Sequence, residues 1–417
     1  MLKKSLLLAL TLVMLLSSVA LAETTNRDMQ LMGGVVVSNA SDSYFFAPME
    51  EGMSNKWGLY ALSKAAEGPI AQAEGYPARL IHASADKVYF LGYKDGARTL
   101  HDLYSVEIST GTYKELLTNI KSAFVYKDDE FYYVSNDDLF TLCSYNLSTE
   151  TSTKIKDMSG SEKTIYDACY YDGNLYFSTK NKNESVEDAY IYNKDNGKAN
   201  NLDKPSPAIV SGMMYEGYRV YAADAGSTQI YAMGFGSKKS TRIGANYNIS
   251  LANPRFGQAM YGYDGENSEL VRVPLDGSAE TKLKLETGTL QRVVLGGTKD
   301  ELLLVGNGAI YAIRPDLSSE TKLFDFDSNT GGTAWTYVAP AGSNAVMVMG
   351  YNAETFTHSG NMMPTNVYAF DRATGEMLFG FPEYDAENPV EPQTPSTIGQ
   401  QPVEEPEEGE TLFKWND

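Results

Sequence analysis

Alternate oxygen-bearing side chains stand in the segment from 325 to 331, Asp-Phe-Asp-Ser-Asn-Thr-Gly. Asp325, Asp327 and Asn329 could converge on one ion, because carboxylate and amide oxygens at every second position suit a Ca²⁺ loop. The glycine stands one position later than in an EF-hand loop, and no glutamate follows at the twelfth position. An ordinary polar turn is therefore the simpler interpretation, and we expect no cofactor apart from this calcium candidate.

A second candidate site joins this segment to a long insertion at residues 351–365. In sheets arranged radially, the connections between sheets and the loops from second to third strands emerge on the same face. We therefore expect the two segments to lie side by side, as exposed loops on a rigid scaffold commonly carry binding. The alternative is a tolerated surface insertion. The predicted recognition patch consists of Asp327, Trp335, Phe356, His358 and Met362.

Patterns that would indicate catalysis are weak. The chain has no Gly-x-Ser-x-Gly elbow, the turn that carries the nucleophile in many hydrolases. Its three histidines, His82, His101 and His358, fall in different repeats by sequence and show no metal-binding spacing. We assign no catalytic residue, and a role without catalysis is favoured over an enzymatic one.

The elements that must position these residues form a repeat. An apolar-aromatic pair or its substitute recurs with its second residue at positions 60, 104, 143, 190, 231, 271, 311 and 368. The spacing is close to 40 in most steps and 57 in the last. A run of apolar and aromatic residues precedes each pair, and Asp-Gly, Asn-Gly or Thr-Gly turns separate the runs. A period near 40 built from short strands is typical of β-propeller blades.

The predicted fold class is therefore all-β, a β-propeller of eight four-stranded blades, with seven blades as the alternative. A lone four-stranded sheet cannot bury both of its faces, whereas sheets stacked around an axis can. The last outer strand is expected near Glu376–Phe381, and the ring would close by packing of the first blade against the last.

The repeat from Thr365 to Phe381, TNVYAFDRATGEMLFGF, resembles a blade of the quinoprotein-like propellers, which read roughly Tyr-Ala-x-Asp-x-x-Thr-Gly-x-x-x-Trp. The matching residues are Tyr368, Ala369, Asp371, Thr374 and Gly375, with Phe379 in place of the tryptophan. The other repeats look more like TolB-like propellers of exported bacterial proteins. These resemblances cover about residues 33–381 and imply a fold but no activity. A quinone-dependent dehydrogenase is not expected, because the chain lacks the regular tryptophans and the adjacent-cysteine disulfide of that class.

The two ends differ in composition from the repeats. Residues 1–22 have the basic start, apolar stretch and Ala-Leu-Ala end of a signal peptide, so we expect an exported protein, extracellular or in the cell envelope. Residues 23–381 are the predicted propeller. Residues 382–417 hold ten acidic residues against one lysine, which indicates a disordered acidic tail. Cys143 and Cys169 are expected as buried, unbridged thiols.

The formal net charge of −20 argues against nucleic acid as a partner, because phosphate neutralisation needs Lys and Arg. We also expect no membrane insertion, and a monomer. The favoured function is a non-catalytic module that binds a protein, a peptide or a glycan. Two alternatives remain. One is a polysaccharide-active lyase or glycosidase with its site in the central pocket, and the other is a scaffold tethered by its acidic tail.

Overall fold

The computed structural model describes residues 34–50, 56–73, 75–94, 100–127, 129–181, 187–193, 196–203, 211–222, 229–237, 239–245, 247, 254–285, 294–306, 308–326, 333–352 and 363–383. Within these ranges the protein consists of antiparallel β-sheets with two short 3₁₀ helices, η2 (Leu62–Glu67) and η3 (Ser159–Ser161). None of the described helices has the length and apolar character needed to cross a lipid bilayer.

Every sheet is built from strands that follow one another in the sequence. The first sheet contains β1 (Val36–Ser38), β2 (Ser43–Pro48), β3 (Trp57–Ala61) and β4 (Ala71–Ala73). The second contains β5 (Tyr76–Ala83), β6 (Lys87–Tyr93), β7 (His101–Glu107), β8 (Tyr113–Lys127), β9 (Glu130–Ser135), β10 (Thr141–Asn146) and β11 (Thr151–Asp157). The third contains β12 (Lys163–Tyr171), β13 (Asn174–Asn181), β14 (Glu187–Asn193) and β15 (Lys198–Asp203).

Four further sheets complete the described structure. The fourth contains β16 (Ser211–Tyr215), β17 (Tyr218–Ala222), β18 (Ile230–Gly234) and β19 (Thr241–Ile243). The fifth contains β20 (Arg255–Phe256), β21 (Ala259–Asp264), β22 (Glu269–Pro274) and β23 (Thr281–Lys284). The sixth contains β24 (Val294–Gly297), β25 (Leu302–Gly306), β26 (Ala309–Ile313) and β27 (Glu320–Asp325). The last contains β28 (Thr333–Ala341), β29 (Ala345–Asn352), β30 (Asn366–Asp371) and β31 (Met377–Phe381).

The apolar-aromatic pairs of the sequence repeat lie on the third strand of each unit, and the runs that precede them lie on the second. The register pairs these two strands in the same way along the chain, with Phe45 opposite Tyr60, Phe90 opposite Tyr104 and Val348 opposite Tyr368. Both strands are covered on two faces by neighbouring sheets, so their residues are apolar almost without alternation. The predicted repeat is therefore confirmed as a structural unit.

The second sheet departs from the four-stranded pattern, because it has seven strands in the order β11-β10-β9-β8-β7-β6-β5. Its central strand β8 is 15 residues long. The first half of β8 pairs with β7, from Tyr113 opposite Val106 onward, and the second half pairs with β9, ending at Lys127 opposite Glu130. Two successive repeats therefore share one continuous strand, which the sequence period had not predicted.

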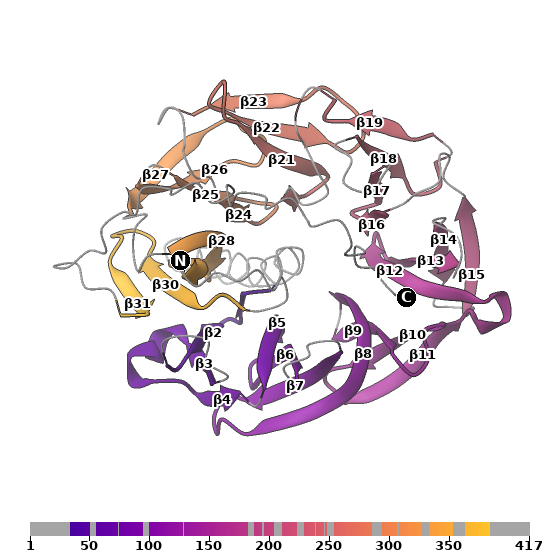
Figure 1. The fold of residues 1–417 in the computed structure, drawn as a ribbon, viewed down its shortest axis with the longest axis horizontal. Coiled ribbons are helices and arrows are strands. Elements are labelled where there is room, and N and C mark those ends of the chain that lie inside the picture. Colours follow the sequence, from indigo (N-terminus) through magenta and orange to yellow (C-terminus); the bar gives the residue numbers. More distant parts are fainter. Residues whose placement is uncertain are drawn as a thin grey trace, which may run out of the picture.

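The sheets stand around a common centre in chain order, which is the β-propeller arrangement (Figure 1). First strands such as β5, β12 and β28 lie near the middle, and last strands such as β11, β23 and β27 lie at the rim. The rim strands are exposed, as in β11, where no residue is fully buried. The first sheet lies beside the last, and we call the interface between β1–β4 and β28–β31 the seam.

One core cluster fills the seam. It includes Val36 and Phe45 from the first sheet and Met347 and Val367 from the last, each exposed by no more than 1%. The expectation that the first blade packs against the last is thus confirmed for these sheets.

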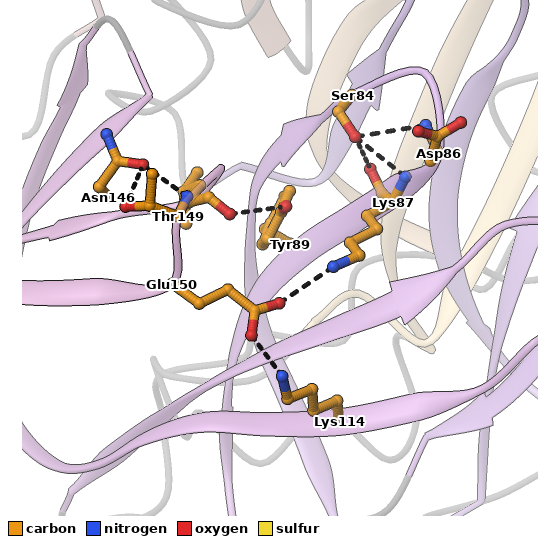
Figure 2. A network of polar contacts seen from close by, with 9 residues as sticks. Ser84, Asp86, Lys87, Tyr89, Lys114, Asn146, Thr149 and Glu150 are labelled. Carbon is orange, nitrogen blue, oxygen red and sulfur yellow. Dashed lines mark hydrogen bonds and ion pairs between the residues drawn. The ribbon is translucent and has the colours of Figure 1, made fainter.

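A polar network joins the two halves of the seven-stranded sheet (Figure 2). Glu150, in the turn between β10 and β11, accepts hydrogen bonds from Lys87 on β6, at 3.0 Å, and from Lys114 on β8. The Tyr89 hydroxyl donates to the Leu147 carbonyl at 3.1 Å. These contacts span β6 to β11 and hold the two repeats against each other.

The cysteines lie where the repeat places them, Cys143 on the third strand of one unit and Cys169 on the first strand of the next. Neither cysteine forms a disulfide; Cys169 is buried as expected, whereas Cys143 is half-buried, so the expectation of a buried thiol is wrong for Cys143. Burial raises the pKa of the Cys143 thiol, so it is a weak nucleophile.

Candidate functional site

The calcium candidate is described only at its first residue. Asp325 ends β27, its side chain is exposed, and its carboxylate lies 2.5 Å from the Lys322 ammonium. Asp327 and Asn329 lie outside the described residues. Among the residues that the structure describes, no group of three or more His, Cys, Asp or Glu side chains is placed to hold a metal ion. The calcium site stays a prediction.

The predicted recognition patch also falls mostly beyond the described ranges, since Asp327, Phe356, His358 and Met362 lie outside them. Trp335 lies on β28, opposite Gly350 of β29. The two insertions start from neighbouring points of the sheet, because Thr333 and Asn352 are paired. The patch itself stays a prediction.

A cavity of about 1020 Å³ opens at the other end of these same two strands. Turns and strand ends from three sheets surround it, the first, the sixth and the last, together with η2 of the first sheet. We call it the seam cavity. Its lining residues are Ser38–Ser43, Leu62, Ser63, Ala65, Ala66, Thr298, Asp300, Glu301, Pro340–Ala345, Asp371, Arg372 and Leu378. Sequence reasoning missed it, because its turns are short and unremarkable in composition.

An ion pair forms one wall of the seam cavity. The Arg372 guanidinium binds Glu301 through two hydrogen bonds, of 2.7 and 2.5 Å, and so connects the last sheet to the sixth. The backbone N–H of Arg372 donates a hydrogen bond to the Asn344 carbonyl at 2.8 Å. The two hydrogen bonds to the Glu301 carboxylate set the orientation of the Arg372 guanidinium in this wall.

The opposite wall is built from the β1–β2 turn. The Asn39 side-chain oxygen accepts hydrogen bonds from the N–H groups of Ser41 and Asp42, at 2.8 and 2.9 Å. The Asp42 carboxylate accepts the Ser63 N–H at 3.1 Å and the Ser63 hydroxyl, so the turn is tied to η2. These side chains complete the local turn geometry, which explains why the sequence has Asn and Asp here.

The lining is acidic. Four acidic residues, Asp42, Asp300, Glu301 and Asp371, line the cavity together with one arginine, Arg372, which is paired with Glu301. Hydrogen bonds from the Thr374 backbone and hydroxyl hold the pKa of Asp371 below its usual value, so it is ionised at neutral pH. A bound group that carries positive charge would be attracted to this cavity.

A second group of ionisable residues lies on the inner strands. Asp167 follows a β-bulge in β12, and its carboxylate accepts the Met214 N–H of β16 at 2.6 Å and the Ala168 N–H at 2.9 Å. Burial raises the pKa of Asp167 to about 6, although the hydrogen bonds and the positive charges of Arg255 and Arg219 oppose the rise. Residues from three neighbouring sheets therefore meet here, and the bulge aims the carboxylate at the next sheet.

His82 and His101 lie on β5 and β7 of the same sheet. The expectation that the histidines fall in different repeats is wrong for this pair, because the repeat begins one strand before the aromatic run that reveals it. Burial lowers the pKa of each imidazole to about 4, and both are neutral at neutral pH.

No protein-family model matches the chain. No curated protein matches it either. Among solved structures, an oligogalacturonate lyase from Vibrio parahaemolyticus is 11% identical with a TM-score of 0.45, over 78% of this chain and 96% of that one. The β-propeller domain of the Trilobed protease from Pyrococcus furiosus is 12% identical with a TM-score of 0.43, over 74% and 98%. TolB from Acinetobacter baumannii is 12% identical with a TM-score of 0.31, over 57% and 63%. Matches this distant say nothing of ligand or reaction.

Proposed function

We propose that this chain is a non-catalytic binding module whose ligand occupies the seam cavity. The observation that carries the proposal is the cavity itself, an open pocket of about 1020 Å³ lined by residues of three sheets. Ligand pockets are commonly of roughly 300–1,000 Å³, mostly apolar with a few fixed polar groups. The seam cavity combines Pro340, Ala341 and Leu378 with hydrogen-bonded turns and the Arg372 ion pair.

The scaffold of this module is an eight-bladed propeller in our proposal. The seven-stranded sheet then counts as two blades that share β8, and the six four-stranded sheets are the others. The pairing of β8 with β7 in its first half and β9 in its second supports this count.

Among protein, peptide and glycan ligands, the lining favours a peptide segment with basic side chains. The carboxylates of Asp42, Asp300 and Asp371 offer charge complementarity to lysine or arginine. The lining residues listed above include no aromatic ring on which a sugar could stack. Apolar atoms of Leu62 and Pro340 can cover the methylene groups of such a side chain.

The test is a peptide array and a glycan array probed with the full chain, followed by calorimetry on the peptides or glycans that bind. Ala66 is exposed on η2 and lines the cavity, so Ala66→Trp should occupy the space and weaken binding at least tenfold. Ala373 is an exposed alanine outside the lining, and Ala373→Trp is the matched control. Asp371→Asn should weaken a basic peptide several-fold, while Asp316→Asn, in a similar exposed turn, should not. Binding that Ala66→Trp leaves intact would place the ligand elsewhere.

One observation favours a second candidate, an enzyme that acts on an acidic polysaccharide. Asp167 has its pKa raised to about 6 and lies in the field of Arg219 and Arg255. A carboxyl that titrates near neutrality can exchange protons with a substrate. Arginines can bind the carboxylates of an acidic polysaccharide. Turnover of a polyuronate that Asp167→Asn abolishes, with the fold unchanged, would establish this function. Absence of turnover across acidic and neutral polysaccharides would leave the binding module.

Export and a second contact, away from the seam cavity, complete the proposal. We propose export with cleavage after Ala22, and the mass of the N-terminal peptide of the secreted protein would test it.

We also propose that the recognition patch around the 351–365 insertion, and calcium at Asp325, Asp327 and Asn329, serve a second contact. Replacing residues 352–364 with a short Gly-Ser turn, and adding a calcium chelator, should each weaken it. A partner whose binding neither change affects does not use this face.

A further inference from the structure

The seam differs from the other interfaces of the ring in its connectivity. Each neighbouring pair of sheets elsewhere follows directly in the chain, so a short covalent connection limits how far the two can separate. In the part of the chain that the structure describes, no strand of the first sheet pairs with a strand of the last. Side-chain packing and a few hydrogen bonds therefore hold the described sheets together at this interface.

Phe379 packs against the buried cluster of the seam from the last sheet. Phe379 of β31 lies with its ring centroid 4.9 Å from that of Phe45 and 5.0 Å from that of Tyr60. The Gly342 N–H donates to the Ser38 hydroxyl at 3.2 Å, and that hydroxyl is 2.7 Å from the Ser43 hydroxyl. The Phe379 side chain is half-buried, so its contact with Phe45 and Tyr60 is smaller than that of a fully buried core residue.

The seam cavity spans this interface. Ser38–Ser43 and η2 lie on the side of the first sheet, and Pro340–Ala345 and Arg372 lie on the side of the last. If the two sheets separated, the cavity would lose one of its walls. A ligand that touches both walls therefore binds only the closed ring.

We propose that the seam is the joint at which the ring opens, and that the occupant of the seam cavity holds it closed. The second half rests on the proposed function, because it requires a ligand in that cavity. The first half does not. Ligand at a hundred times its dissociation constant reduces the open population about 100-fold, since it binds the closed state alone.

Hydrogen exchange measured by mass spectrometry on the full chain tests the joint without a ligand. Phe379→Ala should speed exchange of the β1 and β28 amides at least tenfold. Phe235→Ala is the matched control, because that half-buried ring also bridges two sheets, 4.2 Å from Tyr176, across an interface with a covalent connection. It should leave β1 and β28 unchanged. Equal rates of amide hydrogen exchange in β1 and β28 of the two variants would overturn the proposal that the ring opens at the seam.

The closing role is tested with hexalysine as the probe and with Ala66→Trp as a built-in occupant. Hexalysine added to the wild type should slow hydrogen exchange at the seam, and so should Ala66→Trp without hexalysine. Hydrogen exchange at β13 and β18 should not change in either case. Hexalysine that binds by calorimetry without slowing exchange at the seam would overturn the closing role. If hexalysine does not bind, the preference for basic peptides fails, and Ala66→Trp decides the closing role alone, since unchanged seam exchange in this variant would overturn it.

Discussion

Asp167→Asn tests the electrostatics of the inner strands. Burial raises the pKa of Asp167 from 3.8 to about 6, so the folded state binds its proton more tightly than the unfolded state. Between these two values the folded state carries more protons, and stability therefore falls as the pH rises. The linkage expression gives a penalty of roughly 0.5 kcal/mol at pH 4 and about 3 kcal/mol at pH 7.5. The wild type should lose about 2.4 kcal/mol from this carboxyl across that window.

Asparagine cannot ionise, so the variant should lack this contribution. It keeps one acceptor oxygen for the N–H groups of Met214 and Ala168, and the lost hydrogen bond should cost about 1 kcal/mol at every pH. Urea denaturation at pH 4, 5, 6 and 7.5 gives the difference in unfolding free energy between wild type and variant, in which other titrating groups cancel. Asp316→Asn is the control, because hydrogen bonds lower the pKa of that exposed carboxyl. Parallel pH profiles for wild type and Asp167→Asn would refute the assignment of a half-buried carboxyl that retains its proton.

Three further changes test the packing. Gly296→Ala should destabilise the fold by several kcal/mol, of order 3, because the added Cβ would lie 1.9 Å from a backbone oxygen of the last sheet, whereas Gly160→Ala meets no atom within 4 Å. Equal melting temperatures would contradict this. Glu150→Gln should cost at most about 1 kcal/mol at neutral pH, since its two lysine partners are partly exposed, and 1 M salt should reduce the cost. Those lysines lower the pKa of Glu150, so its contribution is present above its ordinary pKa and fades as the pH falls. Phe379→Ala should lower the unfolding free energy by about 2 kcal/mol, and urea midpoints that match the wild type would show that the seam does not depend on this ring.

Much of the fold was predictable, because the second and third strands of each repeat are covered on both faces. That environment selects runs such as Tyr44-Phe45-Phe46 and pairs such as Leu59-Tyr60, which stand out in the sequence. Some turns could also be predicted from the sequence. Asp172-Gly173 joins β12 to β13 with positive φ at both residues, a conformation that favours this dipeptide. The site was less predictable, because its residues are ordinary turn formers whose spatial neighbours lie hundreds of positions away.

Local pattern alone established the period near 40, the strand order within each unit and the acidic, proline-rich composition of the last 36 residues. These features depend on neighbours a few residues apart, and alternation and turn chemistry record them directly. Contacts between sheets decided the rest. The shared strand β8, the ion pair of Arg372 with Glu301 and the raised pKa of Asp167 all require knowing which sheet packs against which. Ring closure brings residue 38 against residue 342, and no short-range pattern encodes a contact of that separation.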